Sequence, residues 1–190
     1  EGLLKAAITQ RIFVPVYVGS TLIEQGIRPL MDDIVTYFPS PRDHGAMDLV
    51  DGNTLTIHPS DARPVIFIFK TLSDAYVGRL SFAKVLTGTL EPGMDLINAR
   101  TQRKERIGNI NTMTGKETEP IEAAAAGDIV VVPKLNDAHT GDTYSVSGEV
   151  EAAAFRFPNS LHMVAIEAEN PNEEDKLSEF MSRAIEADPT

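Results

Sequence analysis

The sequence contains no cysteine among its 190 residues. This absence excludes disulfides, thiolate metal ligands and cysteine nucleophiles, and it fits a reducing compartment, so we expect a cytoplasmic location. No apolar run approaches the ~20 residues that a membrane span needs, and we expect no membrane partner. The first residues, Glu1-Gly2-Leu3-Leu4, have neither an initiating Met nor the basic-then-apolar order of a signal peptide. We interpret the sequence as a piece of a longer chain or a processed product, and we favour the first.

The motifs that carry catalysis are missing as well. The sequence has no G-x-S-x-G, no G-x-G-x-x-G after a strand and no G-x-x-x-x-G-K-[ST]. Its histidines, at positions 44, 58, 139 and 162, are dispersed and lack the spacing of an H-E-x-x-H zinc site. Asp32 and Asp33 are neighbours on a predicted helix and therefore point apart. We predict no catalytic residue and no metal site, and no cofactor bound by this chain alone.

The net charge of −11 is spread unevenly along the chain. Residues 60–146 carry 10 basic and 11 acidic side chains, whereas residues 147–190 carry 3 and 10. An acidic chain repels nucleic acid, so any contact with phosphates must use a local basic patch. The candidate is the run RTQRKER, with Arg100, Arg103, Lys104 and Arg106, which we predict to bind nucleic acid or the ribosome. A solvated tip between two strands is the alternative interpretation.

Three segments with different patterns of apolar and polar residues follow one another. In residues 1–42, the run RIFVPVYVGS predicts a strand over 11–20, and apolar residues at helical spacing from Pro29 to Phe38 predict a helix. Residues 1–9 resemble the end of an earlier helix. Residues 43–61 are polar and poorly periodic, and we interpret them as a linker. Helix, strand and helix form an α/β pattern whose other strands we expect upstream.

Residues 62–146 have the pattern of a small closed β-barrel or a sandwich. The runs PVIFIF and DIVVV are apolar on successive residues, as in strands buried on both faces, whereas Leu80 and Phe82 of GRLSF alternate with polar residues. The turns TGT, EPG, TGK, AGD and TGD follow at short intervals, and each supplies a glycine for a positive φ or a tight reversal. We expect this barrel to fold independently of both flanks.

Residues 147–190 return to a mixed pattern. The run HMVAIEAEN predicts a strand over 162–170. The run NEEDKLSEFMSRAIEADPT predicts a helix with Asn172 as its N-cap and with acidic residues that complement the helix dipole in its first turn. One strand and one helix do not make a domain, so this segment is interpreted as the beginning of one.

At this point the residues resemble a known family, translation elongation factor G. PVYVGSTLIEQGIRPLMDDIVTYFPSP is similar to the end of its GTP-binding domain, and FKTLSDAYVGRLSFAKVLTGTLEPGMDLIN, with ERIGNI, AGDIVVVPKL and TGDT, is similar to its second domain. FPNSLHMVAIEAENPNEEDKLSEFMSRAIEADPT resembles the start of its third domain. The resemblance implies a mainly β fold, with a Greek-key-type translation-factor β-barrel. It also implies two flanks: an α/β remnant of a GTP-binding domain, and the first strand and helix of an α+β domain.

The resemblance implies a guanine-recognition loop at Gly19, Ser20 and Thr21, where backbone N–H groups meet the base oxygen. The family usually has Ala at the position of Thr21 and Pro at the position of Ala75. Its phosphate loop and switch segments precede the last strand and are absent from this sequence, and phosphoryl transfer depends on them. GTP and Mg²⁺ are therefore expected in the intact parent, whereas this chain alone is expected neither to hydrolyse GTP nor to bind it detectably.

The activity that the resemblance implies is GTP-driven translocation of tRNA and mRNA, with the barrel as a ribosome-docking and relay module. The implied partners are the ribosome, including ribosomal RNA of the small subunit, and the parent's own GTP-binding domain. Three related alternatives stay open: a divergent paralogue, a tetracycline-resistance ribosomal protection protein and a release factor of the same superfamily. An autonomous, non-enzymatic β-barrel binding module is a fourth.

Overall fold

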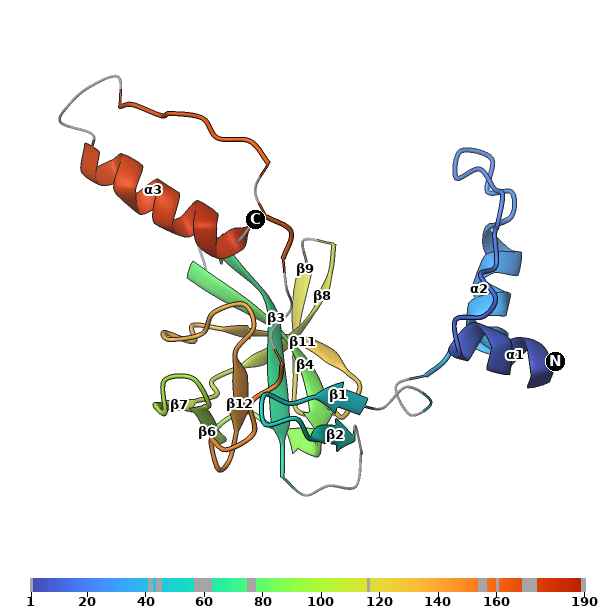
Figure 1. Cartoon of the computed structure of the whole chain (residues 1–190), viewed down its shortest axis with the longest axis horizontal. Helices are drawn as coiled ribbons and strands as arrows, with labels where there is room; N and C mark the ends of the chain where they lie inside the picture. The colour runs from blue at the N-terminus through green and yellow to red at the C-terminus, as the bar shows by residue number, and fades with distance from the viewer. Residues whose placement is uncertain are drawn as a thin grey trace. The chain divides into compact units, whose positions relative to one another are not determined.

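The computed structural model describes residues 2–40, 43, 46–56, 63–74, 78–115, 117–153, 157–159, 161–168 and 174–188. The chain divides into two compact units, Glu1–Gly45 and Ala46–Thr190 (Figure 1). Among the helices that the structure describes, none is long and apolar enough to span a membrane.

The first unit contains the two predicted helices, α1 (Gly2–Thr9) and α2 (Ile27–Tyr37). The strand predicted over 11–20 is wrong, because residues 13–19 have no regular secondary structure. A strand is stabilised by hydrogen bonds to its neighbours, and the described part of this unit supplies only an isolated bridge between Ser20 and Gln25. The β-branched pattern was therefore present in the sequence without a sheet to join.

The second unit begins with a short hairpin inside the segment 43–61, which the sequence had suggested was a linker. Strand β1 (Ala46–Asp48) pairs antiparallel with β2 (Thr54–Thr56). A bridge joins Leu49 to Ala152, so this hairpin is attached to the chain that leaves the barrel. The sequence gives little sign of it because the strands have three residues each, too few for a periodic pattern.

The main sheet has eight strands in the order β7-β6-β12-β3-β4-β11-β8-β9, and every neighbouring pair is antiparallel. It curls into a half-barrel, so the predicted mainly β, translation-factor-like barrel is confirmed (Figure 1). Strand β12 lies between β6 and β3, and β11 lies between β4 and β8, so the order in space departs from the order in sequence. The strands are β3 (Val65–Asp74), β4 (Gly78–Thr87), β6 (Asp95–Asn98), β7 (Lys104–Arg106), β8 (Ile110–Thr114), β9 (Glu117–Ile121), β11 (Ile129–Pro133) and β12 (Thr143–Ser145).

A small pair of strands, β5 (Thr89–Leu90) and β10 (Ala124–Ala125), completes the barrel unit. The glycines of the predicted turns TGT, EPG, TGK, AGD and TGD all have a positive φ. At Gly93, φ is 87°, a conformation that a residue with a Cβ adopts only under strain. The turn chemistry read from the sequence is confirmed.

Two apolar clusters lie on the two faces of β3 and β4, which explains why β3 is apolar on successive residues. Ile66 and Ile68 belong to the larger cluster inside the curl, together with Ala83 and Val85 of β4. Val65 and Phe67 belong to a second cluster with Leu86 and Ala152, against which Met47 and Leu55 of the β1–β2 hairpin pack. The hairpin therefore covers an apolar surface that the barrel strands leave on their outer face.

At the other end of the unit, helix α3 (Glu174–Ala187) forms as predicted and lies against β3 (Figure 1). The predicted N-cap, Asn172, is outside the described residues. The strand predicted over 162–170 is wrong for residues 162–168, which have no regular secondary structure. Leu161 and Met163 are almost fully exposed, so the apolar pattern again lacks a neighbouring strand in the part of the chain that the structure describes.

Candidate functional site

The basic run identified in the sequence begins in the turn between β6 and β7 and continues through the whole of β7, from Lys104 to Arg106. Asn98 shapes the turn, because its Oδ1 accepts hydrogen bonds from the backbone N–H of Arg100 at 2.9 Å and of Thr101 at 3.2 Å. Gln102 has a φ of 56°, and its Nε2 donates to the carbonyl oxygens of Ala99 at 2.7 Å and Gly148 at 3.0 Å. Side chains of the turn therefore hold its backbone in place.

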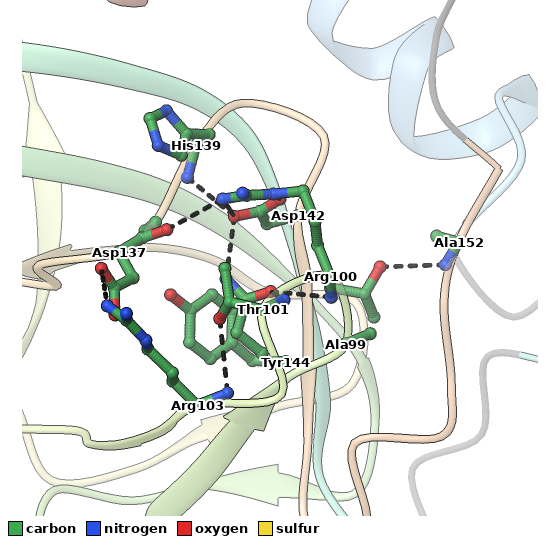
Figure 2. A network of polar contacts seen from close by, with 12 residues as sticks. Ala99, Arg100, Thr101, Arg103, Asp137, His139, Asp142, Tyr144 and Ala152 are labelled. Atoms are coloured by element: carbon green, nitrogen blue, oxygen red, sulfur yellow. Dashed lines mark hydrogen bonds and ion pairs between the residues drawn. The ribbon is translucent and has the colours of Figure 1, made fainter.

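Arg100 points back toward the barrel and binds Asp142 (Figure 2). Its Nε and one terminal nitrogen donate to the two carboxylate oxygens of Asp142 at 2.7 and 2.9 Å. The same carboxylate accepts bonds from Asn98 Nδ2 at 2.8 Å and from the backbone N–H of His139 at 2.9 Å. Its side chain is only 5% exposed. Arg100 is therefore a structural clamp between the hairpin and the segment that precedes β12.

Burial of the Asp142 carboxyl opposes its ionisation, but the hydrogen bonds from Arg100, Asn98 and the His139 N–H outweigh burial and hold its pKa below the usual value. The hydrogen bond to Asp142 likewise raises the pKa of Arg100. Both groups are therefore charged at neutral pH, and their pairing leaves little net charge at this point of the surface.

Glu105, inside the basic run, has a structural role that the sequence did not reveal. Its carboxylate accepts a hydrogen bond from Tyr144 Oη at 2.6 Å and one from the backbone N–H of Asn136 at 2.7 Å. Burial, followed by the bond to Glu105, raises the pKa of Tyr144 well above its usual value. The Glu105 side chain thus attaches the loop 134–141 to the hairpin, because it holds a backbone N–H of that loop.

Arg103, Lys104 and Arg106 are exposed and point away from the barrel core. Arg103 contacts both carboxylate oxygens of Asp137 at 3.2 Å (Figure 2), and Lys104 contacts Asp95 at 2.8 Å. The hydrogen bond from Lys104, with a smaller contribution from the charge of Arg106, lowers the pKa of Asp95. These three cations differ from Arg100, which is also exposed but is bonded to the buried Asp142.

The run is therefore less basic in space than in sequence. Its four cations lie beside four carboxylates, and only that of Glu105 is within the run. The others come from the strand before it and from the segment before β12, at Asp95, Asp137 and Asp142. Sequence reasoning missed them because their distance along the chain hides their proximity; pairing of β12 with β6 brings the two segments together.

An open hollow of about 480 Å³ lies beside the clamp and is lined by Val50, Arg100, His139, Thr140, Gly141, Asp142, Glu151 and Ala152. Its cation and its buried carboxylate already satisfy each other. Within the described ranges, no cluster of three or more potential metal ligands occurs.

The loop predicted to recognise guanine is closed by two backbone hydrogen bonds. Ser20 N–H donates to the Gln25 carbonyl at 2.9 Å, and Gln25 N–H donates back at 3.0 Å. A Cβ at Gly19 would lie 2.7 Å from the Gln25 oxygen, so a side chain there would prevent closure. Thr21 follows with an exposed side chain. Gly19 thus precedes a turn that Ser20 and Gln25 close and that Thr21 begins, and the Ser20 N–H is already engaged in closing it.

The fold is that of a translation-factor β-barrel domain. Residues 64–147 match the family model described as elongation factor G domain 2. Over its full length the chain is 35% identical to elongation factor G of Rhodopseudomonas palustris (strain BisB18) and 38% identical to elongation factor G 2 of Syntrophomonas wolfei (strain DSM 2245B / Goettingen). It spans 28% of the length of each.

A solved crystal structure of a protein from Thermus thermophilus has a similar fold, with a TM-score of 0.76 and 26% identity; the match covers 99% of this chain and 26% of that one. The resemblance to elongation factor G predicted from the sequence is confirmed.

Proposed function

We propose that this chain is part of a ribosome-dependent translational GTPase that promotes translocation, acting in the cytoplasm. The barrel serves as its ribosome-docking and relay module, and the chain alone is not catalytic. The observation that carries the proposal is the similarity to elongation factor G along the whole of this chain, combined with a hairpin that exposes three cations and whose turn is held by side-chain hydrogen bonds.

The docking surface is the outer side of the β6–β7 hairpin, and its partner is ribosomal RNA of the small subunit. Arg103, Lys104 and Arg106 supply the phosphate contacts, because their side chains are exposed and their acidic neighbours are exposed or half-buried. Arg100 is excluded from this role by its bonds to the buried Asp142. The hydrogen bonds within the turn lower the entropy cost of binding, since the hairpin is already ordered.

A second partner is the parent's own GTP-binding domain, which would bind GTP and Mg²⁺. In the first unit, Val14, Val16 and Val18 are largely exposed, and apolar surface of this kind favours burial against further protein. Gly19, Ser20 and Thr21 would then form part of the wall around the guanine base. Phosphate binding and hydrolysis require groups that this sequence does not contain.

The test is a charge reversal in the full-length protein. Replacing Arg103 and Lys104 by Glu should weaken ribosome binding and reduce its salt dependence by about one unit of log–log slope for each lost phosphate contact. The matched control replaces Lys70 and Lys84 on another part of the barrel by Glu, an equal change of charge. If the control weakens binding and the hairpin variant does not, the docking surface lies around Lys70 and Lys84 instead.

A further inference from the structure

The hairpin presents two kinds of ion pair that differ in how easily a phosphate can replace the carboxylate. In the clamp, the Asp142 side chain is 5% exposed and bonds to Arg100, to Asn98 and to a backbone N–H. Removing that carboxylate would leave several buried donors without a partner, which is costly. The clamp pair is therefore permanent.

The outer pairs have the opposite character. Arg103 and Asp137 are 71% and 31% exposed, and Lys104 and Asp95 are 62% and 45% exposed. Exposed ion pairs contribute little to stability, because water and salt screen them and the long side chains lose rotamer freedom. A backbone phosphate carries one negative charge, as a carboxylate does, and it can likewise accept two hydrogen bonds from a guanidinium. Each carboxylate can consequently be exchanged for a phosphate at small cost.

We propose that Asp137 and Asp95 act as exchangeable covers, by which we mean carboxylates that pair with Arg103 and Lys104 until a phosphate replaces them. By pairing with these cations, the two carboxylates suppress binding of the hairpin to arbitrary RNA. The charge of each carboxylate cancels that of its cation as felt by a distant polyanion, so the hairpin exerts little long-range attraction on RNA. At contact, an RNA backbone that presents phosphates in matching positions displaces the carboxylates. The inference deepens the proposed function and rests on it in one respect, that the hairpin meets RNA.

The experiment measures binding of the 190-residue chain to a fluorescent uridine oligomer of about 20 nucleotides by anisotropy, over a range of salt concentrations. We expect Asp137→Asn and Asp95→Asn each to raise the affinity about threefold at low salt and to steepen the log–log salt dependence by about 0.7 for each freed cation, the increment for single-stranded nucleic acid. Glu119→Gln is the matched control, since it removes one exposed charge from the distant edge strand β9 and should change the affinity little.

A double-mutant cycle decides whether the gain comes from Arg103. In an Arg103→Gln background, Asp137→Asn should give no gain, because the cation that it uncovers is gone. The inference is overturned if Glu119→Gln raises the affinity as much as Asp137→Asn does, or if the gain persists without Arg103. Either result would mean that net charge alone governs binding.

This outcome is separable from the proposed function, since the oligomer assay needs no ribosome. If Asp137→Asn raises oligomer binding while the Arg103→Glu, Lys104→Glu variant binds ribosomes normally, the covers exist and the docking surface lies elsewhere. If ribosome binding depends on Arg103 and Lys104 but Asp137→Asn leaves oligomer binding unchanged, the docking surface is correct and the covers are refuted.

Discussion

At the scale of single residues, the buried polar groups of the barrel differ in whether they have hydrogen-bond partners. Asp142 accepts four hydrogen bonds, and a charged partner stands beside it. Ser81 Oγ is also buried, but it has no hydrogen-bond partner among the described residues. The two groups should respond to substitution in opposite directions, because a satisfied buried group contributes to stability and an unsatisfied one lowers it.

Replacing Asp142 by Asn should lower the free energy of unfolding by about 2 kcal/mol, because Arg100 loses its charged partner and the amide cannot accept from every donor that now surrounds the carboxylate. This loss is smaller than the one expected for a fully buried ion pair, since Arg100 is 46% exposed. Urea unfolding of the chain measures the effect. The control is Asp51→Asn, an exposed aspartate in the β1–β2 turn whose carboxylate accepts hydrogen bonds from Asn53 and has no charged partner among the ion pairs described; equal losses in the two variants would contradict a special role for Asp142.

The same carboxylate makes stability depend on pH. Its pKa is lower in the folded chain than in the unfolded chain, so the folded state binds the proton less tightly. The contribution is therefore present above the unfolded pKa of about 3.9 and is lost as the pH falls through the folded pKa. In Asp142→Asn, the decline of stability below about pH 4 should be shallower than in the parent chain.

Ser81→Ala should leave stability unchanged or raise it by up to about 1 kcal/mol, because the substitution removes a hydroxyl that was desolvated without compensation. The matched variant is Thr71→Val. Thr71 lies opposite Ser81 in the sheet, and its hydroxyl is 3.0 Å from that of Thr140. The free energy of unfolding of Thr71→Val should be lower by about 1 kcal/mol. Thermal unfolding distinguishes the two, and a clear loss in Ser81→Ala would show that its hydroxyl is satisfied after all.

At the scale of elements, the parts of the sequence that predicted structure well were those whose signal is local. The turn glycines required a positive φ wherever they occurred, and the run around Val65 was apolar on successive residues because it has an apolar cluster on each face. The predictions of strands over 11–20 and 162–170 were wrong for the described residues, because a strand also needs a neighbouring strand to pair with, and a local sequence pattern does not indicate whether one is present. The clamp could not be predicted for the same reason, since Arg100 and Asp142 meet only through pairing of β6 with β12.

The β1–β2 hairpin gives the barrel a boundary that differs from the one inferred from composition. Met47 and Leu55 pack on the outer cluster of Val65, Phe67 and Leu86, and Ala152 closes it. A chain of residues 46–153 should therefore be more stable than one of residues 62–146, in which this apolar surface would be exposed to water. We expect the longer chain to melt at a temperature higher by several degrees, roughly 4–8 °C for each kcal/mol in a domain of this size.

The comparison is made by calorimetry on the two purified chains. A third chain, residues 46–153 with Met47→Ser and Leu55→Ser, separates the apolar packing from the effect of length, and it should melt near the shorter chain. Equal melting temperatures for the long and short chains would show that the hairpin adds nothing to the barrel.

At the scale of the whole molecule, the hairpin also determines where the chain enters and leaves the barrel. The Val50 N–H donates to the Glu151 carbonyl at 3.0 Å, and the Ala153 N–H donates to the Asp48 carbonyl at 2.8 Å. The incoming and outgoing segments thus run antiparallel, side by side. A force that separates the preceding and following parts of the chain pulls these two segments apart from their open end and breaks their hydrogen bonds one after another. While these bonds hold, the load between the flanks bypasses the curled sheet; once they break, it passes to β3 and β12, the first and last strands of the sheet along the chain, which are themselves an antiparallel pair.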